Sequence, residues 1–266
     1  MLKIVHIIPN LKKGGAERLV LDICNEFSLR EKFQIKLVTF SPHNDYPNLS
    51  KNIDWIVIPS YFIPSLTKQP EINISQLQHF LENFKPDAIH THLWETEIVC
   101  HRINYNRAKW VTHFHDNMPQ LESHLIPLTK KEITNLYEKK IILKKYKNTN
   151  YNFICISKDT KNYAIKVLPK RLHPSILLLP NAINYEKFYS PVTFPNKTLK
   201  LINIGSFVNK KNQQLAINIL AHIRQLGVEA NLTLLGDGIL KDHLISIANN
   251  LNVSNHVIFI GNVLDV

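Results

Sequence analysis

Several absences narrow the classes of protein that this 266-residue sequence can belong to. It has only three cysteines, which lie far apart among apolar residues and predict buried thiols in a reducing compartment rather than disulfides or a zinc ribbon: Cys24, Cys100 and Cys155. No run of 18 apolar residues occurs, and Pro9 interrupts the first apolar stretch too early for a signal peptide. No tandem repeat or low-complexity tract is visible. These absences predict a globular, cytoplasmic protein.

Acidic residues are scarce as well, because 21 of them oppose 32 lysines and arginines and leave a net charge of +11. This surplus fits acidic partners such as nucleotides, anionic lipid surfaces or nucleic acid. Seven lysines against two glutamates lie between residues 130 and 147, where apolar residues share one face of a predicted helix. Such a helix can lie on an anionic membrane, or it can pack on a sheet by its apolar stripe, and we favour the second interpretation.

Strand and helix patterns alternate along most of the chain, which is typical of α/β proteins. The apolar run Leu2–Ile8 is followed by Gly14 and Gly15 and by a helix with apolar residues at spacings of three and four. An amphipathic helix is predicted over residues 73–84. Further strands are predicted over residues 33–40, 53–58, 87–91, 110–115, 153–157 and 175–180. The pattern predicts a parallel, doubly wound sheet.

The alternation restarts after a segment that is punctuated by prolines. We predict strands at residues 201–205, 231–235 and 257–260, with helices over residues 213–226 and 239–251. The sequence therefore predicts an N-terminal domain of residues 1–188, a linker of residues 189–199 and a C-terminal domain of residues 200–266. Two Rossmann-like domains of this kind are expected to hold a ligand in the cleft that faces the carboxyl ends of both sheets.

Residues 201–212 predict a turn that could hold a phosphate group. Gly205 allows the backbone to turn sharply after the strand. The helix that begins near Asn212 directs its unpaired N–H groups and the positive end of its dipole at the turn, beside Lys210 and Lys211. An ordinary turn with two solvated lysines gives the same pattern, so this feature alone does not decide the function.

Six motifs together resemble the family 4 glycosyltransferases. They are Gly14-Gly15-Ala16-Glu17-Arg18, His115-Asp116, Asn181-Ala182-Ile183-Asn184 with Phe188, Gly205 with Lys211-Asn212, Gly236-Asp237-Gly238, and Val257 with Phe259 and Gly261. The match covers nearly the whole chain in the family's order and spacing. The resemblance implies the two-domain GT-B fold and transfer of a sugar, with retention of configuration, from a nucleotide-diphosphate sugar to an acceptor hydroxyl.

The resemblance also implies the partners of the protein. It implies no cofactor and no essential metal, a glycan or lipid-linked acceptor, and a place in cell-surface polysaccharide or glycolipid synthesis. We expect no nucleic-acid partner, and the basic helix suggests peripheral contact with anionic lipid at the inner face of the membrane.

The same resemblance implies roles for individual residues. His115 corresponds to the catalytic histidine that contacts the donor sugar, and Gly14 and Gly15 leave room for the diphosphate or the acceptor. The donor-binding residues are Gly205, Ser206, Lys210, Lys211, Gly236, Asp237 and Gly238. Ser206 stands where the family commonly has arginine, so Lys211 is expected to be the main cation opposite the leaving diphosphate. Asp237 is also a candidate helix cap, and loops 61–70 and 122–129 are candidate acceptor loops or inert connections.

Two other functions stay open. His113 lies two residues before His115, and His90 and His92 form a second such pair. Histidines in this arrangement could bind zinc, with Asp116 or Asp87 completing the ligand set of a metal-dependent hydrolase. A chain that binds a nucleotide sugar without turning it over would instead be a binding module.

The C-terminal domain is expected to be incomplete. In the family, two glutamates that hold the donor follow the strand at 257–260, and this sequence ends at Val266 before such a pair. We therefore expect exposed apolar surface on the second sheet and impaired sugar transfer by this chain.

Overall fold

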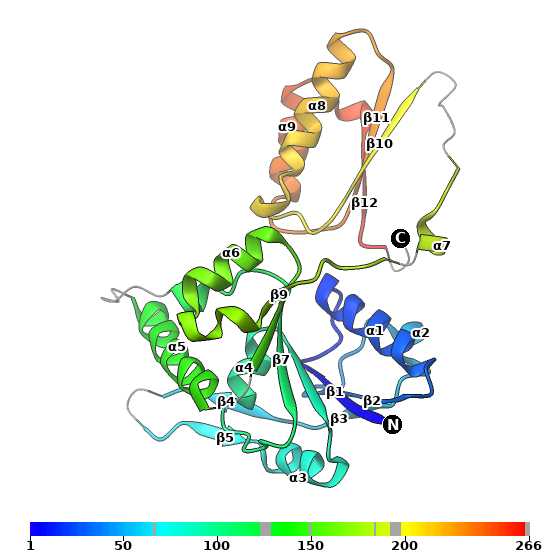
Figure 1. Ribbon diagram of the computed structural model, residues 1–266. Coiled ribbons are helices and arrows are strands. Elements are labelled where there is room, and N and C mark those ends of the chain that lie inside the picture. Colours follow the sequence, from blue (N-terminus) through cyan, green and yellow to red (C-terminus); the bar gives the residue numbers. More distant parts are fainter. Residues whose placement is uncertain (66–67, 123–128, 149–150, 184, 192–197, 264–266) are drawn as a thin grey trace. The chain divides into compact units, whose positions relative to one another are not determined.

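The chain divides into two compact units, unit 1 (Met1–Ile183) and unit 2 (Asn184–Val266), each with its own sheet (Figure 1). A computed structural model describes residues 1–65, 68–122, 129–148, 151–183, 185–191 and 198–263. The predicted linker of residues 189–199 includes residues 192–197, which lie outside this description. Among the described residues, none of the helices is long and apolar enough to cross a membrane.

Unit 1 is built on a seven-stranded sheet in which every pairing is parallel. Its strands are β1 (Leu2–Ile8), β2 (Phe33–Thr39), β3 (Trp55–Val57), β6 (Ala88–His92), β7 (Lys109–Phe114), β8 (Tyr151–Cys155) and β9 (Ile176–Leu178). The order β3-β2-β1-β6-β7-β8-β9 confirms the predicted doubly wound sheet. The winding direction reverses between β1 and β6, which is where ligands bind in open sheets of this kind.

Helices cover both faces of this sheet (Figure 1). On one face α1 packs Val20 and Leu21 against Ile4 and Ile8 of β1. The helices α3, α4, α5 and α6 contribute to the core on the other face. Their bounds are α1 (Gly15–Ser28), α2 (Pro47–Ser50), α3 (Ser75–Phe84), α4 (Trp94–Cys100), α5 (Lys130–Asn148) and α6 (Lys158–Val167), with 3-10 turns at Pro119–Glu122 and Lys170–Ser175.

The predicted loop of residues 61–70 contains a strand, so that prediction is wrong in part. An antiparallel hairpin pairs β4 (Tyr61–Ile63) with β5 (Glu71–Asn73). It forms because Phe62 is buried against the edge of the His101 ring, while Tyr61 and Ile63 on the other side are exposed. Asn73 belongs to this hairpin, so α3 begins at Ser75 rather than at residue 73. In the second candidate acceptor loop, residues 123–128 lie outside the described residues.

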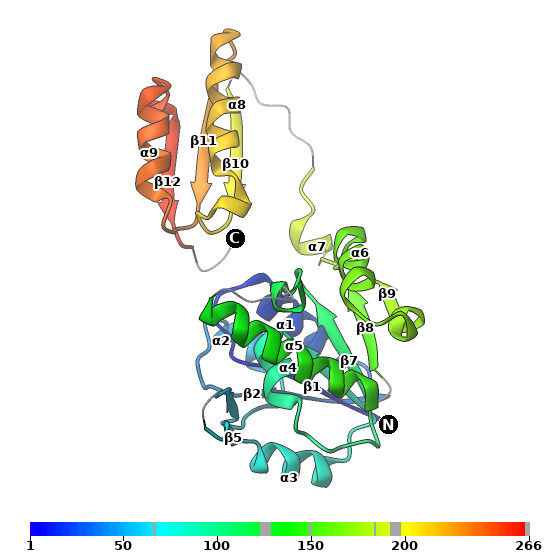
Figure 2. The ribbon, with the colours of Figure 1, turned by 90° about the vertical axis from the view of Figure 1, so that its left-hand side faces the viewer.

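Unit 2 has a parallel sheet of order β10-β11-β12. Its elements are α7 (Tyr185–Phe188), β10 (Leu199–Ile204), α8 (Gln213–Gln225), β11 (Ala230–Leu235), α9 (Lys241–Asn250) and β12 (Val257–Gly261), with 3-10 turns at Asn209–Lys211 and Ser254–His256. Both long helices lie on the same side of the strands (Figure 2). Four isoleucines on the uncovered face are 51–62% exposed, which confirms the expected apolar surface: Ile202, Ile204, Ile258 and Ile260.

All three cysteines are free and buried, as the sequence predicts. Cys24 lies in α1, Cys100 in α4 and Cys155 in β8. Burial raises the pKa of the Cys100 thiol to about 12, so this thiol stays protonated at neutral pH. The cysteines are packing residues, and none of them is in a reactive setting.

Candidate functional site

Gly14 and Gly15 form the N-terminus of α1, which follows β1 after a short loop. Gly14 is fixed by Tyr46, whose hydroxyl accepts from the Gly14 N–H and donates to the Gly14 carbonyl, both at 2.9 Å. The Glu17 carboxylate lies against Gly14, because a Cβ at Gly14 would fall 2.2 Å from its Oε2. Around Gly15 the space is open. A ligand can therefore approach the start of α1 at Gly15, while Glu17 already stands beside Gly14.

Glu17 and Tyr46 also belong to this site, although the sequence alone assigns neither of them a role. Partial burial raises the pKa of Glu17, whose carboxyl group lies in the first turn of α1. No sequence pattern places Tyr46 here, because it comes from the loop before α2, 32 residues along the chain from Gly14.

Five histidines gather on one face of the seven-stranded sheet, at the reversal between β1 and β6. Strand pairing aligns His6 with His90 and His92 with His113. Residues two apart on a strand share a face, so the alignment places five rings together. We call these residues the histidine cluster: His6, His90, His92, His113 and His115.

The rings of the histidine cluster contact one another. Ring nitrogens of His6 and His92 lie 3.1 Å apart, and those of His92 and His115 lie 2.9 Å apart. Nδ1 of His113 lies 3.2 Å from Nε2 of His90. The His113 and His115 rings are stacked with centroids 4.2 Å apart. The cluster is thus a continuous layer of imidazoles that ends at His115, beyond the last residue of β7.

Burial keeps these rings neutral. It lowers the pKa of His6 to about 3 and that of His113 to about 4. The pKa of His115 falls to about 3 through burial and the proximity of His113, and the pKa values of His90 and His92 are also lowered by burial. At neutral pH each ring has one N–H donor and one lone pair, so each can hydrogen-bond a sugar hydroxyl or bind a metal ion.

The structure brings together the two predicted pairs of histidines and adds His6, whose place in the apolar run Leu2–Ile8 was the only signal for it. The groups that could hold a metal ion among the described residues are His6, His90 and His92, and His92, His113 and His115. Neither predicted carboxylate joins them. Asp87 accepts from the Lys3 N–H, because it precedes β6 at the opposite edge of the sheet. Asp116 accepts from the Asn117 N–H.

The opposite face of the same strands carries a buried charged group. Glu97 of α4 is fully buried and accepts hydrogen bonds from Thr91 of β6, Thr112 of β7 and the hydroxyl of Tyr146 of α5. The Lys145 ammonium lies 3.8 Å from the carboxylate, and its side chain is 6% exposed. We call these five residues the glutamate network. It fixes α4 and α5 to the centre of the sheet, beneath the histidine cluster.

Lys145 therefore plays a different part from the other lysines of α5. Its ammonium also lies 4.6 Å from the centre of the Trp110 ring. Burial alone would lower the pKa of Lys145, but Tyr151 and Glu97 outweigh it and the pKa is raised. On the same helix Ile142 is buried, and Tyr137 and Ile141 pack on the core. The apolar stripe of α5 thus packs on the sheet, as the favoured interpretation predicts.

In unit 2 the predicted phosphate turn has its expected parts. β10 ends at Ile204, Gly205 has a φ of +150°, and α8 begins at Gln213. The Lys211 side chain lies over Gly205, because a Cβ there would fall 3.5 Å from Cδ of Lys211. Lys211 is exposed, and Asn212 turns the chain into α8 through a left-handed conformation with a φ of 49°. A cation and a helix N-terminus therefore stand at the carboxyl end of β10.

Ser206 and Lys210 are exposed beside this turn. The Gln213 amide, which is buried, donates to the carbonyls of Gly205 and Ser206 at 3.3 and 3.1 Å. Gln213 therefore holds the turn from its buried side, a role that the sequence does not predict.

The second glycine motif packs tightly against the first. A Cβ at Gly236 would lie 2.1 Å from the Gly205 carbonyl oxygen, and one at Gly238 would lie 2.6 Å from the Phe207 carbonyl oxygen. Both glycines also have positive φ angles, +136° and +157°. Close packing of the two turns is therefore sufficient to explain both glycines.

Asp237 does not cap α9, so that interpretation is wrong. The helix begins at Lys241, two residues later than predicted, and Leu240 precedes it. The Asp237 carboxylate accepts from the Gly238 N–H at 2.8 Å and lies 3.8 Å from the Lys241 ammonium. Asp237 thus closes its own turn, and its carbonyl accepts from the Phe207 N–H of the neighbouring turn.

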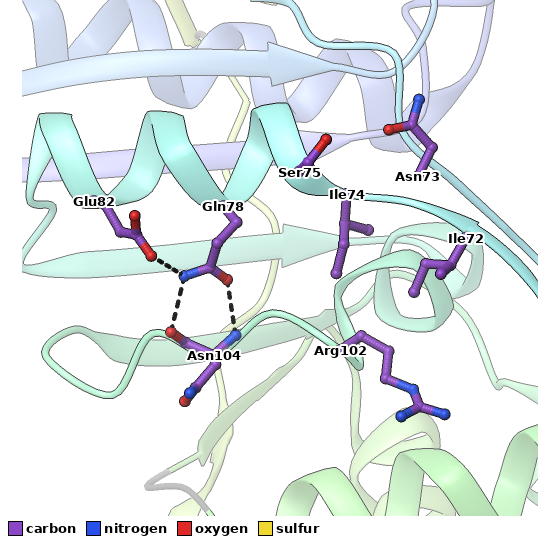
Figure 3. Close-up of a pocket in the computed structure, with 8 residues that line it drawn as sticks. All are labelled: Ile72, Asn73, Ile74, Ser75, Gln78, Glu82, Arg102 and Asn104. Atoms are coloured by element: carbon purple, nitrogen blue, oxygen red, sulfur yellow. Dashed lines mark hydrogen bonds between the residues drawn. The ribbon is translucent and has the colours of Figure 1, made fainter.

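A hollow of about 520 Å³ lies at the start of α3 and shares no residue with the predicted site (Figure 3). In its wall, Gln78 forms hydrogen bonds with Glu82 and Asn104. The Gln78 amide donates to Glu82 and to the carbonyl of Asn104, and its oxygen accepts from the Asn104 N–H. These bonds connect α3 to the segment after α4 and leave the Gln78 amide satisfied.

Comparison with known proteins decides the family. Glycosyltransferase Family 4 matches residues 13–187, which is more than half of the chain, and Glycosyl transferases group 1 matches residues 185–266. The chain belongs to the family 4 glycosyltransferases. As a member of this family it is a transferase, and the sequence resemblance is confirmed.

Individual relatives are distant. The putative glycosyltransferase EpsF of Bacillus subtilis (strain 168) is 21% identical over an alignment of 285 residues. The alignment covers 97% of this chain and 68% of EpsF. The uncharacterized glycosyltransferase MJ1059 of Methanocaldococcus jannaschii is 27% identical over 199 residues, and the match covers 68% of this chain and 47% of MJ1059. The crystal structure of TarM is 12% identical with a TM-score of 0.71, covering 99% of this chain and 77% of TarM. The structural likeness shows the GT-B fold of this glycosyltransferase.

Proposed function

We propose that this family 4 glycosyltransferase transfers a sugar from a nucleotide-diphosphate sugar to an acceptor hydroxyl, with retention of the anomeric configuration and without a metal ion in the chemical step. The observation that carries the proposal is the turn of unit 2, where Lys211 lies over Gly205 beside the N-terminus of α8. A departing diphosphate gathers negative charge, and a fixed cation with backbone N–H groups stabilises it.

The roles of the other donor residues follow from this placement. Gly205, Gly236 and Gly238 keep the two turns close together, and Asp237 holds the second turn. Ser206 and Lys210 are exposed beside Lys211 and would contact the phosphate oxygens. Because no arginine follows Gly205, we expect Lys211 to supply most of the electrostatic stabilisation in this half of the site.

Unit 1 would supply the group that contacts the sugar. His115 lies at the carboxyl end of β7, and its neutral ring can accept or donate a hydrogen bond to a sugar hydroxyl. The open space at Gly15 would receive the diphosphate or the acceptor at the start of α1. Glu17 faces the same region, so its carboxylate is a candidate to orient an acceptor hydroxyl.

The ligands and activities of similar structures suggest which donor and acceptor to test first. One TarM structure is a complex with UDP and α-GlcNAc-glycerol, and another neighbour is the lipopolysaccharide outer core galactosyltransferase WaaB. We therefore propose a uridine diphosphate sugar as the first donor to test and a cell-surface glycan or glycolipid precursor as the acceptor class. The experiment should also include guanosine and adenosine diphosphate sugars, so that the preference for the base is measured directly.

The decisive test removes the Lys211 charge. Lys211→Ala should lower nucleotide-diphosphate affinity by at least tenfold in titration calorimetry, because a charge-assisted hydrogen bond is lost. Lys200→Ala is the matched control, since it removes the same charge from an exposed position of β10. Equal affinities of the two variants would contradict the donor site. Donor binding without any transfer or hydrolysis would indicate a binding module instead of an enzyme.

We also propose peripheral contact with anionic membranes through the exposed lysines of α5. Lys140, Lys144 and Lys147 are exposed, whereas Lys145 belongs to the glutamate network and must be left intact. Exchange of these three exposed lysines for glutamine should reduce sedimentation with phosphatidylserine vesicles at low salt. The control exchanges Lys51, Lys68 and Lys200 for glutamine. Equal loss in both triple variants would show that only net charge matters.

A further inference from the structure

The histidine cluster contains more imidazoles than contact with a sugar requires. One hydroxyl contact needs one ring, yet five rings are packed together without a carboxylate. Nε2 of His6 and Nε2 of His113 are both buried and have no hydrogen-bond partner among the described residues. Buried polar atoms are normally satisfied, so these two unpaired ring nitrogens indicate missing partners.

We propose that His92, His113 and His115 form a site for a divalent transition-metal ion of the zinc class, and that an ion bound there inhibits sugar transfer. One ring nitrogen of each residue lies within 4.8 Å of the others. Three imidazoles with an open fourth position are a ligand set that suits zinc, and imidazole also suits copper, nickel and iron.

The spacing of the rings is close to that of metal ligands. In a tetrahedral site with Zn–N bonds of about 2.0–2.1 Å, two ligand nitrogens lie about 3.3 Å apart. Nδ1 of His92 and Nε2 of His115 lie 2.9 Å apart, so this pair would separate slightly when an ion enters. Small ring rotations would bring the third nitrogen into the same coordination sphere. We assign that role to Nε2 of His113, because it is the buried, unpartnered nitrogen of the three residues.

The two remaining histidines are placed to orient the ligands. Nδ1 of His113 lies 3.2 Å from Nε2 of His90, and Nε2 of His92 lies 3.1 Å from Nδ1 of His6. If His113 donates its Nδ1–H to His90 and His92 donates its Nε2–H to His6, the lone pairs of Nε2 of His113 and Nδ1 of His92 are free for the ion. A hydrogen bond of this kind fixes the tautomer of a metal-binding histidine and raises its basicity.

The position of this set favours it over the alternative of His6, His90 and His92. His92 is the last residue of β6, and His115 follows β7, so the proposed site opens at the carboxyl edge of the sheet. His115 is partly exposed, whereas His6 is completely buried. An ion can therefore enter beside His115, and its fourth position would face the same edge.

The inhibitory effect rests on the function proposed above. A ring of His115 whose lone pair coordinates an ion has no lone pair left for a sugar hydroxyl. The family resemblance implies that transfer needs no metal, and inhibition by a bound ion is compatible with that chemistry.

The metal site is tested without any sugar substrate. Full-length, tag-free protein is titrated with Co²⁺ by visible absorbance and with Zn²⁺ by calorimetry. We expect one equivalent to bind with a tetrahedral Co²⁺ spectrum, and His113→Gln and His115→Gln each to lower the affinity at least tenfold. His243→Gln, an exposed histidine of unit 2, should bind like the wild type. Failure to bind either ion, or equal affinity in all three variants, would overturn the proposal.

A second measurement uses only the wild type, in case a buried substitution impairs folding. X-ray absorption of the zinc-loaded protein should show scattering from three imidazoles. A spectrum with one imidazole or none would overturn the site, whatever the variants do.

A separate experiment tests inhibition. Donor binding and transfer are measured in chelator and then with one equivalent of Zn²⁺, and we expect at least a tenfold loss that excess chelator reverses. Unchanged transfer with zinc bound would overturn the inhibition and leave the metal site standing. If the metal-free protein binds no nucleotide sugar, the proposed function fails, and the result of the Co²⁺ titration still decides the metal site.

Discussion

The sheet of unit 1 has helices on both faces, whereas in the described part of unit 2 the helices cover one face of the sheet. Unit 1 buries polar groups on both sides of its central strands, as neutral rings on one side and a paired charge on the other. The core of unit 2 is apolar apart from the buried Gln213 amide, and its uncovered face exposes Ile202 and Ile260. Unit 1 should therefore respond strongly to pH and to loss of charge, and unit 2 should respond mainly to changes in packing.

Acidification is expected to produce the largest difference in stability between the two units. Folding depresses the pKa of His6, His113 and His115 to about 3–4 from 6.5, so the unfolded chain binds more protons as the pH falls. The contribution of these histidines to the stability of unit 1 is fully present above pH 6.5 and is lost as the pH falls toward 4. The loss is about 1.4 kcal/mol per pH unit for each histidine that stays neutral. Since domains are stable by about 5–15 kcal/mol, unit 1 should unfold within this window.

Tryptophan fluorescence separates the two units in that experiment. Trp55, Trp94 and Trp110 are the three tryptophans of the sequence, and all of them lie in unit 1. In unit 2, His222 and His243 are exposed and His256 is half-buried beside Asn231. Since these three histidines form no buried cluster, unit 2 should keep its structure in the same range, as followed by methyl resonances. A fluorescence signal that stays constant from pH 7 to 4.5 would contradict the account of the histidine cluster.

Breaking the buried ion pair is expected to have the next largest effect. Lys145→Met should destabilise unit 1 by about 3–5 kcal/mol in urea unfolding, because it leaves the Glu97 carboxylate buried without its cation. The additional change Glu97→Gln should recover part of the loss. Lys144→Met, an exposed neighbour on α5, should change stability by less than about 0.5 kcal/mol. Equal effects of Lys145→Met and Lys144→Met would show that the pair is not a determinant of stability.

In unit 2 the sharpest effect should come from the contact between the two glycine turns. Gly236→Ala should cost about 2–4 kcal/mol, because its Cβ would meet the Gly205 carbonyl at 2.1 Å and because φ is +136°. Gly227→Ala separates strain from collision, since Gly227 also has a positive φ but an open surrounding, and it should cost about 1–2 kcal/mol. Calorimetric unfolding measures both. Similar values would mean that the turns are not in close contact.

The smallest effect is expected on the uncovered face of the second sheet. Ile202→Thr with Ile260→Thr should change stability by about 0.5 kcal/mol or less, because both side chains are already more than half exposed. Leu234→Ala, at a buried position of β11, should cost about 2–5 kcal/mol. The double variant should also self-associate less in sedimentation velocity. A large loss of stability in the double variant would indicate that this face is covered in solution.

The sequence predicts the alternation of strands and helices well, because buried parallel strands are short apolar runs between helical patterns. It places Gly205, Lys211 and α8 at one turn, and it places the two histidine pairs on neighbouring strands, since both depend on local periodicity. It does not predict Tyr46, Gln213 or the fifth histidine, because their contacts join segments that are distant or that lack a pattern. The cap assigned to Asp237 fails because a salt bridge and a tight turn use that carboxylate instead.

Strand β6 has a consequence for how the protein can vary in length. Its residues His90, Thr91 and His92 alternate between the histidine cluster and the glutamate network. Deletion of one residue from the strand would shift every later side chain to the other face, so an imidazole would meet Glu97 and a threonine would enter the layer of rings. A substitution damages one of the two assemblies, but such a deletion damages both at once. We therefore expect relatives to differ in length in the turns on either side of β6 and to keep the strand free of insertions and deletions.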